Sequence, residues 1–449
     1  MRFRLQTINN ICGRLGIINE IERLPTFQME TPNLLFYTNG GCIPHLTHDV
    51  ILMLTSDVLP LQIPLDNIYH ATEAIIKLDV SVNTFIGLPE YLSFCTLQDP
   101  TTTVKQGYHK ENVATIWSKH GKQFITKARH MELMESLKPD MYISLCDGDT
   151  NINSSKKRIL NSARTTNEAF RYCYDQHVSS PTLCKKALIA PIEGGYDLTT
   201  RELCAKYLSN FPVVGYLIDG LYSDGASVHK IPFHSVEKII DHTLKYIPVE
   251  RLRIIQGAWE PQSILKMIKL GVDLFDTSFP CLNAENGCAL VFNFNVENLF
   301  SENVQLVNLY HSKNENNIWK KELNNKNEYK SNSCVSNRDN KLNENNKISD
   351  GVQFKNNVND EQNNTSKKNF VSPYSISLYD TKYFDDFTPI IENCLCLTCR
   401  KHTKAYVHHL LITKELLGMV LLMIHNLHHY MEFFRYIREH LRRNIGKCD

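Results

Sequence analysis

Between residues 137 and 300 the sequence alternates short apolar runs with longer stretches whose apolar residues recur at helical spacing. Runs rich in β-branched residues predict buried parallel strands, and spacings of three and four predict amphipathic helices. Because these units repeat in order, they require a parallel sheet, either doubly wound or closed into a barrel. The predicted strands are Met141–Leu145, Ala187–Pro191, Val213–Ile218, Leu252–Ile255 and Val272–Phe275, and the predicted helices are Ser155–Asp175, Leu198–Ser209, Ser235–Tyr246 and Pro261–Leu270.

Polar or glycine residues follow every one of these predicted strands. In a barrel the carboxyl ends of the strands converge on one mouth, where chemistry is built. A doubly wound sheet often carries a glycine-rich phosphate turn, and the sequence contains neither G-x-G-x-x-G nor a Walker motif. Any one polar residue can simply cap its strand, but five in register favour an α/β fold of the (β/α)8 TIM type. The strand ends are Asp147-Gly148-Asp149, Glu193-Gly194-Gly195, Asp219-Gly220, Gln256-Gly257 and Asp276.

The most specific motif is a cysteine cluster near the C-terminus, Cys394-Leu-Cys396-Leu-Thr-Cys399. A C-x-C-x₂-C turn presents three sulfurs to one centre, and tetrahedral Zn²⁺ then needs one further nitrogen or sulfur ligand. Four protein ligands leave no position for a catalytic water, so we predict one structural zinc ion; free buried thiols without metal are the alternative. On spacing alone the fourth ligand stays open among His402, His408, His409 and His425.

The composition changes sharply near residue 312. Residues 311–370 contain 18 Asn in 60 positions and show neither strand nor helix periodicity. Such a segment buries too little apolar area to offset its ordering entropy. We therefore predict that residues 312–369 form a disordered insertion. Residues 1–311 then supply the N-terminal strands and most β/α units, and residues 370–449 supply a zinc-binding segment with C-terminal helices that complete the barrel.

Charge and hydropathy restrict the environment. The formal net charge of +1 gives no global attraction to nucleic acid or membrane. The best apolar run, Leu416–Ile424, is far shorter than the ~18 residues of a membrane span, so we predict no integral membrane segment. Scattered cysteines suit a reducing compartment and predict the cytosol. The basic N-terminus leaves mitochondrial import open, and a peripheral place on the mitochondrial outer membrane is a second possibility.

The C-terminal segment carries a local basic cluster. Arginines on one helix can contact nucleic-acid phosphates, or they can form a solvated face whose charge suits a helix C-terminus. The sequence supports both interpretations equally. The residues are Arg435, Arg438, Arg442, Arg443 and Lys447.

The zinc segment resembles that of the tRNA-guanine transglycosylases, in which C-x-C-x₂-C is followed by a histidine 26 residues after the third cysteine. That position here is His425. The resemblance therefore implies the ligands Cys394, Cys396, Cys399 and His425. Tyr383-Phe-Asp-Asp-Phe-Thr-Pro389 and Gly271-Val-Asp-Leu-Phe-Asp276 also look like segments of this family.

The resemblance implies a (β/α)8 barrel with a zinc-bearing insertion and a role in replacing guanine by a deazaguanine (queuine in eukaryotes) in the tRNA anticodon loop. The family uses one Asp as nucleophile, at the place of Asp276 here, and a second Asp as general acid/base. Polar strand ends read the flipped base.

Several catalytic motifs of the family are altered in this chain. Asp276 is not followed by the family's Leu-Pro-Thr-Arg, and Asp99 lies in a loop without the family's two glycines. The base-reading Gln-Gly-Gly has become Glu193-Gly194-Gly195, and a Gly-Gly-Leu has become Asp219-Gly220-Leu221. These departures imply a non-catalytic member of the family, with no catalytic residue of its own and Asp276 as a vestige.

Such a member would pair with a catalytic subunit in a heterodimer and act on tRNA through the complex. Its implied role is to support exchange of guanine for queuine at wobble position 34 of tRNAs with a G-U-N anticodon. Two alternatives stay open. One is a competent transglycosylase with Asp276 as nucleophile, in which Asp99 would serve as acid/base while Asp147 and Glu193 bind the base. The other is a zinc-stabilised scaffold with no tRNA role.

Overall fold

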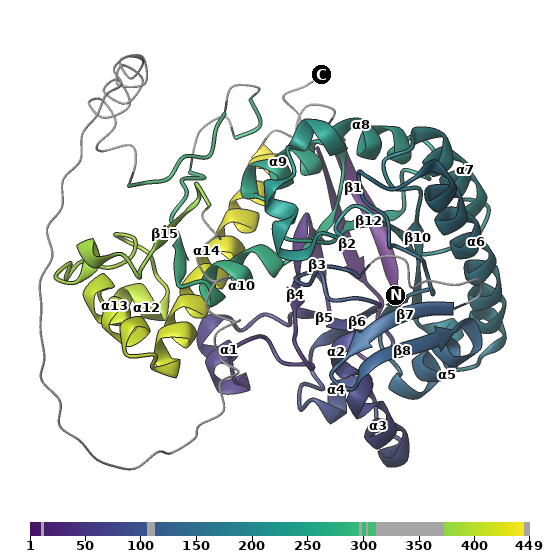
Figure 1. The fold of residues 1–449 in the computed structure, drawn as a ribbon, viewed down its shortest axis with the longest axis horizontal. Coiled ribbons are helices and arrows are strands. Elements are labelled where there is room, and N and C mark those ends of the chain that lie inside the picture. Colours follow the sequence, from purple (N-terminus) through teal and green to yellow (C-terminus); the bar gives the residue numbers. More distant parts are fainter. Residues whose placement is uncertain (10–12, 106–112, 296–298, 302–303, 311–371, 444–449) are drawn as a thin grey trace, which may run out of the picture.

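The computed structural model describes residues 1–9, 13–105, 113–295, 299–301, 304–310 and 372–443, and its centre is a closed barrel of eight parallel strands surrounded by helices (Figure 1). The barrel closes where β13 pairs with β4, with Phe275 opposite Leu34. The predicted (β/α)8 fold is thus confirmed. In barrel order the strands are β4 (Asn33–Tyr37), β5 (Pro60–Pro64), β6 (Leu92–Thr96), β9 (Met141–Ile143), β10 (Ala187–Ile192), β11 (Gly215–Ile218), β12 (Leu252–Ile255) and β13 (Leu274–Asp276).

The helices around the barrel begin and end where their sequences indicate. The side chains of Ser155 and Asp197 cap α6 and α7 by accepting backbone N–H bonds. Pro261 occupies the first turn of α9 and Gly271 ends it with φ 95°. The helical elements of this region are α1 (His48–Leu54), α2 (Leu65–Ile68), η1 (Tyr69–Ala71), α3 (Thr72–Leu78), α4 (Val82–Phe85), α5 (Lys127–Leu137), α6 (Lys156–Ser179), η2 (Leu183–Lys185), α7 (Leu198–Leu208), η3 (Gly225–Lys230), α8 (Phe233–Leu244), α9 (Pro261–Leu270) and α10 (Ser278–Glu285).

Two smaller antiparallel sheets flank the barrel. β1 (Arg2–Asn9), β2 (Gly13–Asn19) and β3 (Met29–Thr31) form the first, and the buried ion pair between Arg14 and Asp273 joins it to the barrel. The second is the hairpin β7 (Val113–Ser118) and β8 (Gly121–Thr126), inserted between β6 and α5.

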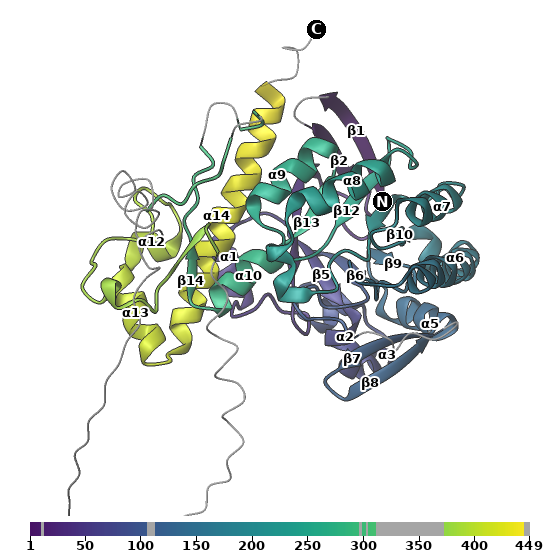
Figure 2. The same ribbon diagram turned by 45° about the horizontal axis from the view of Figure 1, so that its top comes forward.

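A C-terminal subdomain lies to one side of the barrel (Figures 1 and 2). β14 (Cys288–Leu290) and β15 (Ser375–Ser377) pair across the Asn-rich stretch, so the chain before and after that stretch belongs to one unit. The predicted disordered insertion, 312–369, lies outside the described residues, and its boundaries stay a prediction. The other elements of the subdomain are η4 (Thr381–Tyr383), α12 (Leu397–Lys401), α13 (Lys404–Ile412) and α14 (Leu416–Arg443).

Helix α14 joins the subdomain to the barrel. It runs for 28 residues, and its C-terminal half buries aromatic side chains against the barrel. The Phe434 ring lies 5.8 Å from that of Phe275 on β13, and the Tyr430 ring stacks 6.3 Å from that of Phe279 on α10. Neither α14 nor any other helix among the described residues is long and apolar enough to cross a membrane.

Candidate metal centre and barrel mouth

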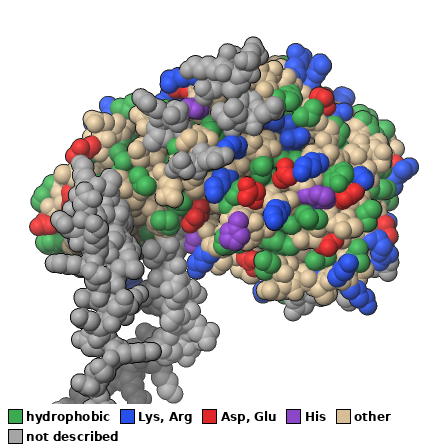
Figure 3. All heavy atoms as spheres, turned by 90° about the horizontal axis from the view of Figure 1, so that it is seen from above, with side chains coloured by type: hydrophobic (Ala, Val, Ile, Leu, Met, Phe, Trp, Pro, Cys, Tyr) green, Lys and Arg blue, Asp and Glu red, His purple; other side chains and the backbone are tan. Residues whose placement is uncertain are grey.

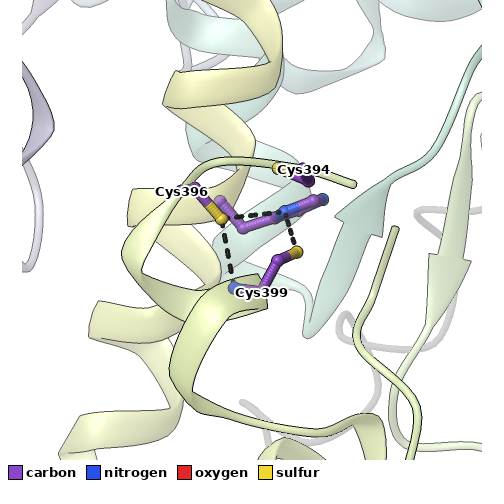
Figure 4. A group of neighbouring side chains, drawn as sticks. Cys394, Cys396 and Cys399 are labelled. Atoms are coloured by element: carbon purple, nitrogen blue, oxygen red, sulfur yellow. Dashed lines mark hydrogen bonds between the residues drawn. The ribbon is translucent and has the colours of Figure 1, made fainter. Parts of the chain in front are cut away.

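The three cysteines of the C-terminal cluster face one another around a single centre (Figure 4). Cys396 is the N-cap of α12, where its Sγ accepts a hydrogen bond from the Cys399 N–H at 3.2 Å. His425 reaches the same centre from α14, with its Nδ1 3.6 Å from Cys396 Sγ and 3.3 Å from Cys399 Sγ. These three residues and Cys394 offer ligand atoms within 4.8 Å of one another.

The spacing of these atoms suits a tetrahedral metal ion. Zn–S bonds of about 2.3 Å and Zn–N bonds of about 2.05 Å place S and N about 3.6 Å apart. The observed separations, 3.3 and 3.6 Å, are close to this value. The quartet can therefore hold a metal ion without moving its backbone.

Neighbouring groups orient the His425 ring, and the cysteine sulfurs around it favour a cation. His425 Nε2 lies 2.9 Å from the Leu290 carbonyl oxygen, which turns Nδ1 toward the sulfurs. Hydrogen bonds from Cys396 and Cys399 hold the pKa of the Cys394 thiol far below its usual range. Burial lowers the pKa of His425, but the sulfurs of Cys394 and Cys399 outweigh burial and raise it to about 10. The same contacts with Cys394 and Cys399 raise the pKa of Cys396, so the cluster pairs a thiolate on Cys394 with a cationic His425, a place that a metal cation can fill.

Other nearby histidines have different partners. His408 Nδ1 lies 2.8 Å from the Leu378 carbonyl oxygen, and His429 Nε2 lies 3.0 Å from that of Phe292. The His402 ring stacks on Tyr406. His428 hydrogen-bonds Cys394 but lies outside the quartet. Of the four histidines that spacing left open, the structure brings His425 to the sulfurs.

The polar strand ends converge on one mouth, as predicted. Asp276 ends β13, and it is 2% exposed. Its carboxylate accepts hydrogen bonds from the backbone N–H groups of Gly257 at 2.6 Å and Ser278 at 2.9 Å. Burial raises the pKa of Asp276 to about 6, and the nearby Asp99 adds to this effect. The candidate nucleophile is thus held by backbone amides.

Asp99, the candidate acid/base, is also engaged by the chain. The Tyr37 hydroxyl and the Asn67 amide each donate to its Oδ2 at 2.8 Å. Its Oδ1 accepts from the Thr101 N–H at 2.7 Å. Both carboxylate oxygens of Asp99 therefore already accept hydrogen bonds from the chain.

The two candidate base-binding carboxyls are sequestered. Arg158, in the first turn of α6, forms a bidentate ion pair with Asp147 and reaches Asp149 at 3.7 Å. Glu193 is fully buried, and burial together with the adjacent Asp219 raises its pKa well above its usual range. Sequence reasoning missed this arginine, although its place eleven residues after Asp147 was a visible signal.

Sequence reasoning also missed how the mouth is filled. Glu193 and Asp219 form a buried trio with Cys146, whose Sγ donates to Asp219 Oδ2 at 3.2 Å. Loops then cross above the strands: the Val104 N–H donates to the Ser223 carbonyl at 2.8 Å. A cavity of about 720 Å³ lies elsewhere, between β3, residues 54–60 and α14.

The four described arginines of the C-terminal helix all pair with glutamates of the chain. Arg435 pairs with Glu432 and Glu439, and Arg443 also pairs with Glu439. Arg438 and Arg442 both face Glu30. These contacts favour the solvated-face interpretation over phosphate binding, while Lys447 lies outside the described residues.

A (β/α)8 barrel with a Cys₃His cluster in an added subdomain is the architecture that the resemblance to the tRNA-guanine transglycosylases implied. The family model described as queuine tRNA-ribosyltransferase matches residues 10–445, and the chain belongs to this family. Three relatives are each named queuine tRNA-ribosyltransferase accessory subunit 2. The chain is 32% identical over 443 residues to that of Aedes aegypti (98% of this chain, 89% of the relative), 31% over 445 to that of Anopheles gambiae (98% and 87%), and 30% over 442 to that of Drosophila mojavensis (98% and 88%).

Proposed function

We propose that this chain is the non-catalytic subunit of a heterodimeric queuine tRNA-ribosyltransferase. It supports exchange of guanine for queuine at wobble position 34 of tRNAs with a G-U-N anticodon. Its own side chains make and break no bond of the substrate. The proposal rests on one observation: the carboxyl groups at the barrel mouth are buried and held by the chain itself. Asp99, Asp147, Glu193 and Asp276 are each at most 4% exposed and each bound or sequestered by the chain's own groups.

The chemistry of base exchange needs the opposite arrangement. A nucleophilic carboxylate must reach the anomeric carbon of the ribose, and a second group must move a proton on the departing guanine. The flipped base also needs an open pocket with free donors and acceptors. Here Arg158 is paired with the Asp147 carboxylate, and Glu193 is fully buried. A guanine would have to displace an internal ion pair to bind.

We also propose that Cys394, Cys396, Cys399 and His425 bind one structural Zn²⁺. Three thiolates and one imidazole match the donor set that zinc prefers, and four protein ligands complete its coordination. When bound, the ion cross-links α12 to α14. The chain's own residues then hold the geometry through the contact of His425 with Leu290.

The catalytic partner docks, in this proposal, on the zinc-binding subdomain. Large apolar side chains are exposed there: Phe384 is 75%, Phe387 76% and Leu395 74% accessible. Phe384 and Phe387 line an open groove of about 380 Å³ with Tyr406 and Ile412. Apolar patches of this kind mark protein interfaces. The accessory role carried in the relatives' names supports a catalytic subunit as the occupant.

A location in the cytosol fits these features. The eleven cysteines among the described residues are all free thiols, three of them in the metal cluster. A reducing compartment keeps such thiols available for metal. Peripheral attachment to the mitochondrial outer membrane stays as the second proposal, since it requires only a surface contact.

The alternative is a competent transglycosylase that uses Asp276. The observation in its favour is that Asp276 and Asp99 remain neighbours at the mouth, and that the pKa of Asp276 is about 6. The test is incorporation of labelled guanine into a tRNA with a G-U-N anticodon, by the chain alone and with its catalytic partner. The proposal expects incorporation only with the partner. Incorporation by the chain alone, abolished by Asp276→Asn, would establish the alternative.

A further inference from the structure

The β7–β8 hairpin presents two unlike faces. In its register Thr115 lies opposite Phe124, and Trp117 lies opposite Lys122, so these residues share one face. The other face carries Ile116 and Ile125, which are both 0% exposed and pack into the core. Thr115 is only 2% exposed, so the first face is open toward the turn, where Trp117, Lys122 and Phe124 lie; this open part is called the outward face below.

The outward face is built from aromatic–cation pairs. Lys105 Nζ lies 3.9 Å from the centroid of the Trp117 ring, and Lys122 Nζ lies 4.6 Å from that of Phe124. Phe124 is 52% exposed, although it has a large apolar ring. An ammonium group over an aromatic face is attracted by the ring and keeps its positive charge; Lys105 is exposed and Lys122 is half-buried. The face thus combines fixed positive charge with accessible aromatic surface.

The charge around the hairpin is one-sided. Residues 113–131 contain four Lys or Arg, two His and no Asp or Glu, in a chain whose formal net charge is only +1, and of these cations Arg129 pairs with the following Glu132. On the face seen in Figure 3, by contrast, cationic and acidic side chains are intermingled. A positive segment without carboxylates is complementary to a polyanion.

The hairpin stands at the rim of the barrel mouth. It follows the carboxyl end of β6, and it packs against α2, which follows β5 (Figures 1 and 2). At its turn the Lys119 ammonium lies beside Gly40, in the loop after β4, and the His120 ring lies 6.1 Å from that of His70, after β5. Loops after three neighbouring strands therefore gather cationic or titratable groups at one edge of the mouth.

We infer that the outward face of β7–β8 is an RNA-binding platform, on which unpaired bases stack against Phe124 and Trp117 while the lysines contact phosphates. The chemistry is that of single-strand binding, in which aromatic rings take bases and a basic track follows the backbone. This inference rests on the proposed function, because it takes the tRNA of the complex as the ligand. It gives the accessory chain direct contact with the substrate, through a surface separate from the C-terminal helix.

The test measures binding of a fluorescently labelled tRNA with a G-U-N anticodon to the full chain, alone and in complex with the catalytic subunit. Two hairpin variants are used: the double variant Lys105→Glu/Lys122→Glu, and Phe124→Ala. Each has a control at the opposite end of the barrel. Lys245→Glu changes an exposed lysine at the end of α8, and Val178→Ala shortens a side chain that is 56% exposed near the end of α6.

The charge variant is expected to flatten the dependence of log Kd on log salt by about 1.4, since each lost phosphate contact removes about 0.7 for a single strand. Phe124→Ala is expected to weaken binding about fivefold or more, because that is the lower range for loss of one base-stacking ring. In the complex both variants should raise KM for tRNA and leave kcat unchanged. The controls should match the wild type.

Hairpin variants that bind tRNA as tightly as the controls, with the same salt slope, would overturn the inference. So would loss of subunit association with unchanged tRNA affinity, because the hairpin would then be a protein contact. Size-exclusion chromatography of the two subunits and guanine exchange by the chain alone test the proposed function independently. If these experiments contradict the proposed function, the binding of tRNA to the isolated chain still tests the hairpin.

Discussion

Cys396→Ser is expected to remove the metal and unfold the zinc-binding subdomain while the barrel stays folded. Cys396 is 3% exposed and both caps α12 and faces His425. Structural zinc contributes about 10–16 kcal/mol to the folding of small zinc domains. This matches or exceeds the 5–15 kcal/mol that stabilises a typical whole domain. The ion is therefore expected to be the largest single contribution to the stability of the subdomain.

The barrel-side half of α14 should survive this change. Tyr430, Phe433, Phe434 and Ile437 are all 0% exposed, so they anchor that half independently of the cysteines. The unfolded region is therefore expected to span residues 379–424. New protease cleavage should appear there, and most of the circular dichroism signal should remain.

Elemental analysis and limited proteolysis check this prediction. Zinc should fall from about one per chain to none, and the exposed thiol variant Cys184→Ser should keep the wild-type content. A Cys396→Ser protein with full zinc content would refute the ligand assignment. Loss of zinc with unchanged protease resistance would refute the reasoning that metal binding supplies the folding energy.

Four further substitutions test the mouth and the partner surface. Asp276→Asn, assayed in the reconstituted complex, should leave the rate of guanine exchange unchanged; a large fall in kcat would give Asp276 a catalytic role. Arg158→Ala should cost about 3 kcal/mol in denaturant unfolding, because it leaves Asp147 buried without its cation, and a change within error would contradict the importance of that pair. Burial beside Asp99 raises the pKa of Asp66 from 3.8 to about 8, so the folded state holds its proton more tightly and stability falls as pH rises toward 8. Asp66→Asn should therefore gain about 1.4 kcal/mol over the wild type for each pH unit between about 5 and 7, and parallel pH profiles would exclude this cause. Phe387→Asp should weaken association with the catalytic subunit at least about tenfold by size exclusion or titration without lowering the melting temperature, since the ring is already exposed.

Periodicity predicted the later barrel elements well. The strands from β9 to β13 agree with the predicted runs to within two residues at each end, and α9 agrees with Pro261–Leu270. These segments are buried on both sides, so their composition reports burial directly. The strand-end carboxyls gather at one mouth because parallel strands present their carboxyl ends at the same face of the barrel.

The earlier strands were not predicted as individual elements. β5 begins and ends with proline, and β6 includes Ser93 and Cys95, so neither run shows a clear β-branched pattern. Both strands are nonetheless fully buried. Tertiary packing decides their conformation, and local propensity contributes little.

The cysteine turn could be read from spacing, but its partner could not. Four histidines lay within reach along the chain, and only the path of α14 brings His425 to the sulfurs. The closed barrel mouth could not be predicted from the sequence either. It depends on where the Arg158 guanidinium points and on how the loops after β6 and β11 meet, and neither follows from residue type.

The aromatic contacts between α14 and the barrel have a consequence for folding in the cell. They join Phe275 to Phe434 and Phe279 to Tyr430, residues that lie far apart in the sequence. Contacts between such distant residues form slowly, because closing the intervening chain costs entropy. Until α14 docks, the rings of Phe275 and Phe279 are open to chaperones and to quality-control proteases. Substitutions that slow this docking should therefore lower the amount of protein in cells, even where the folded structure is unchanged.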